Sequence, residues 1–424
     1  MGKQTHCTGY RSALAVLATV LVATTIAASQ EKVLYSFYDS GGSVLPQAGV
    51  ISDASGNLYG TTFYSGAYGM GMVYELIRTS TGWQETILHS FNVDGIDGFF
   101  PTGGVIFDSA GNLYGTTEFG GSGNCSVGFG CGTVFQLSPD GNGGWNETIL
   151  HEFNGGDGWQ AHAGLVFDSA GHLYGTTANG GTFSEGTVFE LAAAKNGTWS
   201  LKTLHHFSGG VGGSVPWGGV ILDASGNLYG MTNQGGSITT SCRYGCGTVF
   251  ELVHPTQNTG WTGKILHDFS AKAGDGHYPY GSLVFDASGN LYGTTGAGGG
   301  NSDQGIVFEL VPSTGGQWSE KLLHNFNNSP GDGATPSANL IFDSARNLYS
   351  TTLSGGADGE GTVFELTRST GGAWTETILH NFTTQDADGT NPNGGVILDA
   401  FGNLFGATDS GGQNGEGAVF AIRH

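Results

Sequence analysis

A short motif, Asn-Leu-Tyr-Gly-Thr-Thr, recurs along this chain and limits its possible folds more than any other feature. Successive copies are 55, 60, 55, 63, 57 and 56 residues apart. Self-similarity at such periods indicates a repeat architecture, in which each copy is one supersecondary unit. We therefore expect one large domain rather than the two or three that 424 residues would otherwise suggest. The seven copies begin at Asn57, Asn112, His172, Asn227, Asn290, Asn347 and Asn403.

Each repeat contains four segments with the pattern of β-strands. In the second repeat they read GGVIFD, NLYGTT, GTVFQL and WNETILHEF. The first two are joined by Asp-Ser-Ala-Gly-Asn, whose residues favour a tight hairpin turn. Near-continuous apolar runs such as GVIF indicate strands that are covered on both faces. A four-stranded sheet covered on both faces by its neighbours is a blade of an all-β propeller.

The two ends of the chain predict how the propeller closes. The last repeat ends at GAVFAIRH without a fourth segment, whereas EKVLYSF, residues 31–37, is a lone copy of that segment. Joining them gives a seven-bladed β-propeller with four antiparallel strands per blade, closed by the N-terminal strand. The histidine of the fourth segment becomes Tyr35 only in the lone copy, and the Glu or Gln of the third becomes Ala421 only in the last repeat. The alternative is an open array with degenerate ends.

Residues 1–29 have the pattern of a secretory signal peptide. Lys3 and Arg11 precede the apolar run 13–27, and small residues follow it. We expect cleavage there, which leaves residues 30–424 as one propeller domain that is secreted, extracellular or in the cell envelope and has no membrane segment. An uncleaved anchor is the alternative.

The charge balance is strongly acidic. The sequence has 35 acidic and 13 basic residues, for a net charge of −22. Removing the leader takes away two basic residues and no acidic one, which leaves 11 basic residues and a net charge of −24. A nucleic-acid partner is not expected, because the chain has no basic footprint. The 79 glycines, without a collagen period, indicate many tight turns.

Four cysteines follow the leader and form two local pairs. In an exported chain, Cys125 with Cys131 and Cys242 with Cys246 predict two disulfides, each restraining one long loop. Metal ligation is the alternative, although neither spacing is CxxC.

The NLYGTT…GG…GTVFEL unit resembles the GloVer tandem repeat of exported bacterial proteins, a group described as choice-of-anchor. The resemblance covers residues 31–424. It implies an exported bacterial repeat protein of unknown biochemical function and supplies no catalytic residues. The C-terminal AVFAIRH carries no sorting motif or hydrophobic tail, which favours release over anchoring.

The long loops are expected on one face, where a rigid scaffold positions functional residues. Aromatic residues there suit stacking on sugar rings, although they could equally pack each loop against its own blade. The ligand-binding candidates are Phe99, Phe100, Trp159, Trp217, Tyr278 and Tyr280. Calcium is a possible cofactor at Asp386 and Asp388, although this loop lacks the closing Glu of a calcium loop and Asp-Gly is also ordinary turn chemistry.

Six histidines recur in the fourth segment, and we interpret them as structural. They belong to different strands, which are too far apart to converge on one metal. They are His89, His151, His205, His267, His324 and His380. No HExxH, GxSxG or P-loop motif is present. We therefore expect a binding or interaction module for an extracellular polysaccharide or protein; the alternative is a polysaccharide lyase or glycoside hydrolase with its site on the long-loop face.

Overall fold

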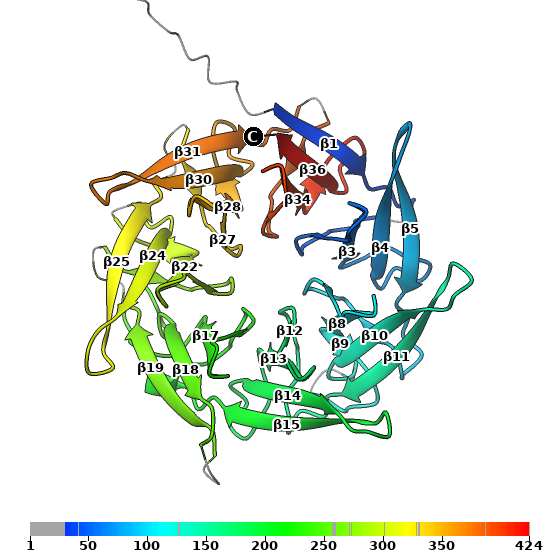
Figure 1. Ribbon diagram of the computed structural model, residues 1–424, viewed down its shortest axis with the longest axis horizontal. Coiled ribbons are helices and arrows are strands. Elements are labelled where there is room, and N and C mark those ends of the chain that lie inside the picture. Colours follow the sequence, from blue (N-terminus) through cyan, green and yellow to red (C-terminus); the bar gives the residue numbers. More distant parts are fainter. Residues whose placement is uncertain are drawn as a thin grey trace, which may run out of the picture.

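The computed structural model describes residues 30–423 except positions 41, 126–127, 257–259, 271, 273, 301, 328, 330 and 386. The predicted signal peptide and Asp386 lie outside the described residues. Within them, seven four-stranded antiparallel sheets surround a central axis (Figure 1). In the same part of the chain, no helix is long and apolar enough to span a membrane. The predicted all-β propeller is confirmed.

The sheets are numbered as blades in chain order, from the axis outward. Blades one and two comprise β2 (Ile51–Ser52), β3 (Leu58–Thr62), β4 (Met72–Thr79), β5 (Gly82–Ser90); β7 (Ile106–Phe107), β8 (Leu113–Thr117), β10 (Thr133–Pro139) and β11 (Trp145–Glu152). Blades three and four comprise β12 (Val166–Phe167), β13 (Leu173–Thr177), β14 (Thr187–Ala193), β15 (Trp199–His206); β16 (Ile221–Leu222), β17 (Leu228–Thr232), β18 (Thr248–Val253) and β19 (Thr262–Asp268).

The remaining blades follow the same plan. Blades five and six comprise β21 (Val284–Phe285), β22 (Leu291–Thr295), β24 (Ile306–Pro312), β25 (Trp318–Asn325); β27 (Ile341–Phe342), β28 (Leu348–Thr352), β30 (Thr362–Arg368) and β31 (Trp374–Asn381). Blade seven comprises β33 (Ile397–Leu398), β34 (Leu404–Thr408), β36 (Ala418–Arg423) and β1 (Gln30–Ser36). Short two-stranded sheets in the long loops pair β6 (Gly98–Phe99) with β9 (Phe119–Gly120), β20 (Gly276–His277) with β23 (Ala297–Gly298), β26 (Gly333–Ala334) with β29 (Ser354–Gly355), and β32 (Gly389–Thr390) with β35 (Ser410–Gly411).

The first strand of the chain completes the last blade. β1 runs antiparallel to β36, with Lys32 opposite Ala421 and Tyr35 opposite Val419. Figure 1 shows the two strands, blue and red, side by side at the top of the ring. The predicted closure is confirmed, and the open-array alternative is wrong. Tyr35 and Ala421, the two exceptions in the repeat, belong to the same blade.

Each position of the repeated motif makes a separate contact, as blade two shows. The amide of Asn112 and the hydroxyl of Tyr114 both donate to Asp108 of the preceding turn, at 2.8 and 3.0 Å. A Cβ on Gly115 would lie 2.6 Å from Cζ of Phe135 on the adjacent strand, so only glycine leaves room for that ring. The motif therefore fixes both the hairpin turn and the packing of the sheet.

The two threonines of the motif connect blades and turn the chain. The hydroxyl of Thr116 donates to the carbonyl of Ala163 in the next blade, at 3.0 Å. The hydroxyl of Thr117 donates to the carbonyl of Phe119, at 2.9 Å, where the long loop begins. Because both groups are buried, each bond satisfies a polar atom that water cannot reach.

The hydrophobic core is divided among the seven interfaces between blades. Phe91, at the end of the fourth strand of blade one, meets Phe135 of blade two edge-on, with ring centroids 5.1 Å apart. Similar contacts recur around the ring and include Phe37 with Tyr74 at the closing interface. Each blade is stable only against its neighbours, so closure buries two sheet faces that would otherwise be exposed.

The connections between blades share one unusual backbone conformation. In six of the seven connections, the residue before a proline has a positive φ; Phe100, for example, has a φ of 60°. In the seventh, Ala161 stands in place of the proline. The N–H of Phe100 donates to Met70 of blade one, and its carbonyl accepts from Glu118 of blade two. Both backbone groups thus bridge adjacent blades, which explains the left-handed conformation. The seven residues are Leu45, Phe100, Gln160, Val215, Tyr278, Thr335 and Asn391.

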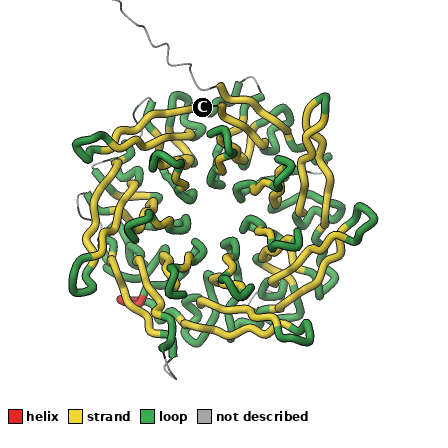
Figure 2. Tube along the Cα trace, in the orientation of Figure 1, coloured by secondary structure: helices red, strands yellow, loops and turns green. Residues whose placement is uncertain are grey.

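Both predicted disulfides are present. Cys125 is bonded to Cys131 and Cys242 to Cys246. Each bridge lies in a loop between the second and third strands of a blade. Figure 2 shows how these and the other loops alternate with the strands around the ring.

Candidate functional site: a groove at the closing interface

A groove of about 920 Å³ lies between blade seven and blade one. Its walls come from β1 and β36 and from the hairpin turns of both blades, including residues 52–56, 78–83 and 397–401. It therefore opens on the side of the short hairpin turns, opposite the face where we expected the site. Its volume falls in the range of small-molecule and oligosaccharide sites.

The groove exists because three repeat positions carry smaller side chains here. At the interface of blades one and two, the hydroxyl of Tyr59 donates to Glu75 at 2.7 Å, and the Tyr59 ring contacts Phe107 at 4.9 Å. At the closing interface the same positions are occupied by Phe405, Ala421 and Ser52. The hydroxyl, the carboxylate and the ring that fill the other interface are thus all absent.

Removal of the glutamate also leaves a lysine without its partner. In blades four and five, cross-strand pairs join Lys264 to Glu251 at 3.3 Å and Lys321 to Glu309 at 3.2 Å. The equivalent Lys32 of blade seven lies opposite Ala421. Its ammonium group lines the groove without a carboxylate on the neighbouring strand.

Two arginines add to this positive charge. Arg78 and Arg423 also line the groove, and both are exposed. Among the described residues, neither they nor Lys32 take part in an ion pair. Three of the 11 basic residues that follow the leader therefore gather at one site, in a chain with a large negative charge.

The two aspartates of the groove accept hydrogen bonds from the backbone of their own hairpin turns. Asp53 accepts the backbone N–H groups of Ser55 and Asn57. Asp399 accepts the corresponding bonds from Phe401 and Asn403. Burial opposes ionisation of Asp399, but these hydrogen bonds outweigh it and lower its pKa. Both carboxylates are therefore held by their own turns, and their negative charges offset part of the positive charge of the three cations.

Aromatic side chains line the rest of the groove. Trp83 and Phe405 pack against the core of the closing interface and are half-buried. Phe401, at the tip of a hairpin turn, is 88% exposed. An aromatic wall beside cationic side chains can contact both the apolar face and the charged groups of a ligand.

The structure separates the predicted site residues on the long-loop face. Trp217 and Tyr280 lie together, with ring centroids 6.1 Å apart, at a cavity of about 150 Å³ around the axis. Trp217 also stacks on His162 at 4.1 Å. Phe99 and Phe100 are in contact with each other, but Phe99 is only 5% exposed.

The other two predicted aromatic residues pack within their loops. Trp159 contacts the core shared by blades two and three. Tyr278 packs on the core of blades four and five, and its hydroxyl donates to the carbonyl of Ser241. Asp388 accepts from His380 at 3.0 Å. Asp386 lies outside the described residues, so the calcium site stays a prediction.

Two buried titratable groups lie beside the axial cavity. Burial lowers the pKa of His162 to about 4. Burial raises the pKa of Glu118 to about 7, against the opposing hydrogen bond from Gln160. The His162 Nε2 and Glu118 Oε1 atoms are 4.0 Å apart. Between pH 4 and 7 both groups are therefore mainly neutral.

The groove residues were missed although the sequence contained a signal for them. Ala421 is the exception among the third-strand acids; this exception supports closure, and it also marks the position where the groove forms. Lys32 aligns with Lys264 and Lys321, so its missing partner could have been noticed once the strands were paired.

The family model of the Gloeobacter/Verrucomicrobia repeat matches residues 124–322 and again residues 237–424, which together exceed half of the chain. This chain belongs to that family. The predicted resemblance is confirmed. The family model itself describes a sequence repeat. None of the curated proteins compared with the chain matches it.

Solved structures similar to this family member share its fold at low sequence identity. The extracellular domain of a hybrid two-component system from B. thetaiotaomicron is 12% identical, with a TM-score of 0.54; the match covers 92% of this chain and 39% of that one. A fungal alcohol oxidase of the AA5 family, solved with copper, is 14% identical, with a TM-score of 0.52; the match covers 93% and 76% of the two chains. This chain thus spans well under half of the first protein.

Proposed function

We propose that this protein is an extracellular binding module whose groove between blades seven and one holds a carboxylate-bearing polysaccharide. The main support for this function is that Lys32 has no glutamate opposite it on β36. Its counterparts in blades four and five each bind a glutamate, whereas Lys32 faces Ala421 and an open groove. The missing group is a carboxylate, so a ligand carboxylate is the natural occupant of its place.

The other groove residues suit a sugar acid. Arg78 and Arg423 can bind further carboxylates in a bidentate manner. Trp83, Phe401 and Phe405 offer faces on which the C–H groups of a sugar ring can pack. An extended groove of about 920 Å³ accommodates several sugar units rather than a single small ion. The two disulfides support an extracellular location, because such bonds persist in oxidising compartments.

The experiment measures binding of polygalacturonate oligomers by titration calorimetry, with neutral galactan as the uncharged probe. We expect the oligomers to bind and galactan to bind much more weakly. Lys32→Ala should weaken binding about tenfold, which corresponds to about 1.4 kcal/mol. Lys264→Ala is the matched control, because its ammonium group is paired with Glu251 and lies in blade four.

Two results would count against this function. Equal affinity for galactan, or an unchanged affinity in Lys32→Ala, would remove the charge-based account of the groove. Release of shortened or unsaturated products from the oligomers would favour the alternative, a carbohydrate-active enzyme.

A further inference from the structure

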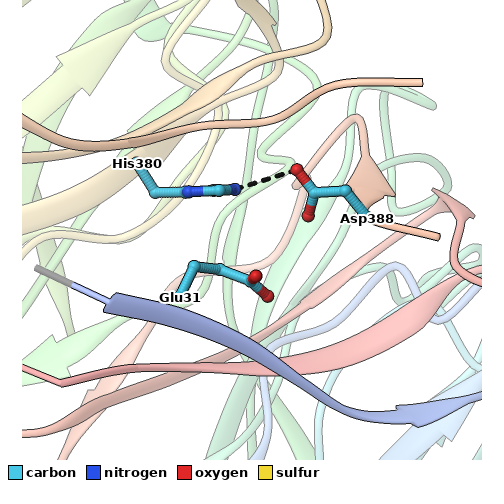
Figure 3. A group of neighbouring side chains, drawn as sticks. All are labelled: Glu31, His380 and Asp388. Carbon is cyan, nitrogen blue, oxygen red and sulfur yellow. Dashed lines mark hydrogen bonds and ion pairs between the residues drawn. The ribbon is translucent and has the colours of Figure 1, made fainter. Parts of the chain in front are cut away.

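Four clusters of one histidine and two carboxylates join neighbouring blades away from the groove. Each takes its histidine from the fourth strand of one blade, its aspartate from the loop that follows, and its glutamate from the fourth strand of the next blade. The clusters are His89, Asp97 and Glu147; His267, Asp275 and Glu320; His324, Asp332 and Glu376; and His380, Asp388 and Glu31. Figure 3 shows the last cluster, in which Glu31 on β1 of blade seven lies beside His380 and Asp388 of blade six.

The spacing of the three side chains suits a small metal ion. His324 Nε2 lies 3.3 Å from Asp332 Oδ1 and 3.5 Å from Glu376 Oε2. Within each cluster the three ligand atoms lie within 4.8 Å of one another. A tetrahedral ion with bonds of 2.0–2.1 Å separates its ligand atoms by about 3.3 Å. Small side-chain shifts would therefore bring all three atoms into contact with one ion.

Each cluster also contains buried carboxylate oxygen atoms that form no hydrogen bond, as Glu85 does at the closing interface. Among the described residues, the Oε1 atoms of Glu31, Glu147, Glu320 and Glu376 are buried and accept no hydrogen bond. Asp97, which is only 4% exposed, likewise leaves Oδ1 unpaired. Burial of an unpaired carboxylate oxygen is costly. Two carboxylates and a neutral imidazole would balance the charge of one divalent cation.

We propose that each of the four clusters binds a divalent transition-metal ion, with Zn²⁺ the best fit, and thereby ties adjacent blades together. An imidazole nitrogen with two carboxylates is a ligand set that zinc accepts, whereas calcium takes oxygen ligands throughout. Water would complete the coordination. At Glu31, His380 and Asp388 the ion would fasten the strand that closes the ring.

The remaining interfaces provide controls within the same molecule. His151 contacts Asp157 at 3.0 Å, but Leu201 stands where the glutamate would be. His205 faces Gly263, and its loop has Gly212 at the aspartate position. At the closing interface Glu85 is present, but Tyr35 replaces the histidine and donates to it at 3.2 Å. The expected stoichiometry is therefore four ions per chain.

The test uses the mature protein after treatment with EDTA and dialysis. Titration calorimetry with ZnCl₂ should give four sites per chain, and CaCl₂ should not compete. Glu376→Gln should lower the count to three, whereas the control Glu85→Gln should leave four. CoCl₂ should give the visible absorption bands of a tetrahedral cobalt site with a nitrogen ligand.

Several results would overturn the proposal. They are no zinc binding, a zinc count unaffected by Glu376→Gln, or equal competition by calcium. If Glu376→Gln does not fold, the cobalt spectrum of the unaltered protein still decides, because absent tetrahedral bands would exclude a tetrahedral ion in these clusters, which is the proposed geometry. In that case a proton shared by the two carboxyl groups, and not a metal ion, would reduce the repulsion between them.

Discussion

Glycine occupies the fourth position of the repeated motif in six blades because an aromatic ring from the next strand fills the space above it. The Cβ of any other residue would lie 2.5–2.7 Å from that ring in each of the six. Blade six has Ser350 instead, opposite Phe364 on the neighbouring strand. The repeated glycine is therefore explained by the space that the ring needs, and blade six accommodates a serine at this position.

Gly115→Ala tests this requirement. Its added methyl group would meet Phe135 at 2.6 Å, so the ring or the strand must move. Overpacking of this kind typically costs about 1–3 kcal/mol. We expect a lower midpoint of urea unfolding for Gly115→Ala. The control Ser350→Ala keeps the Cβ and loses only the hydrogen bond to the Asn339 carbonyl, about 1 kcal/mol, so its midpoint should fall less. Equal effects of the two substitutions would refute the packing explanation.

His162 should make the protein sensitive to acid. Its folded-state pKa is lowered to about 4 by burial, below the ordinary value of 6.5. The stability from keeping it neutral is therefore present above pH 6.5 and is lost as the pH falls toward 4. The full effect is about 3 kcal/mol. His162→Gln should show a flatter fall in unfolding free energy between pH 6.5 and 4 than the unaltered protein; parallel curves would contradict this assignment.

At the scale of elements, strand β1 does more than complete a sheet. It pairs with β36 over residues 30–36, places Phe37 against Tyr74, and lines the groove with Lys32 and Leu34. An antiparallel strand at this position removes the free edge that the last blade would otherwise present.

Deletion of residues 30–37 should open the ring. We expect a lower melting temperature and self-association through the exposed edge of β36, measured by calorimetry and by size-exclusion chromatography with light scattering. The matched control begins at residue 30 and should remain monomeric at the same concentration. An unaltered melting temperature and mass in the deletion variant would show that closure contributes little.

The strands and the closure could be predicted from the sequence, whereas the groove becomes recognisable only after the strands are paired across the closing interface. Turn chemistry and apolar patterning repeat seven times, so errors in one copy are corrected by the others. The groove arises from missing atoms at Ser52, Phe405 and Ala421, which are far apart in the chain. Likewise, the sequence places the histidines on different strands, but the glutamate that contacts four of them belongs to the next blade, as Glu147 does for His89.

At the scale of the whole molecule, the ring presents two different faces. Long loops surround the axis on one face, where Trp217 and Tyr280 are partly exposed, and short turns frame the groove on the other. The net charge repels an anionic polymer at long range, but salt screens exposed charges beyond about 8–10 Å. Local charge at Lys32, Arg78 and Arg423 therefore decides whether a carboxylate binds.

Whether Lys32 binds a ligand carboxylate is decided by the affinity of Ala421→Glu for polygalacturonate oligomers, measured by titration calorimetry. The substitution restores the glutamate of the other blades opposite Lys32, as in the Lys264–Glu251 pair. Ala421→Gln, of similar size but uncharged, is the matched control. We expect at least a tenfold loss of affinity for Ala421→Glu, about 1.4 kcal/mol, with an unchanged or higher melting temperature and a smaller loss for Ala421→Gln. Unchanged affinity in Ala421→Glu would show that Lys32 does not bind a ligand carboxylate.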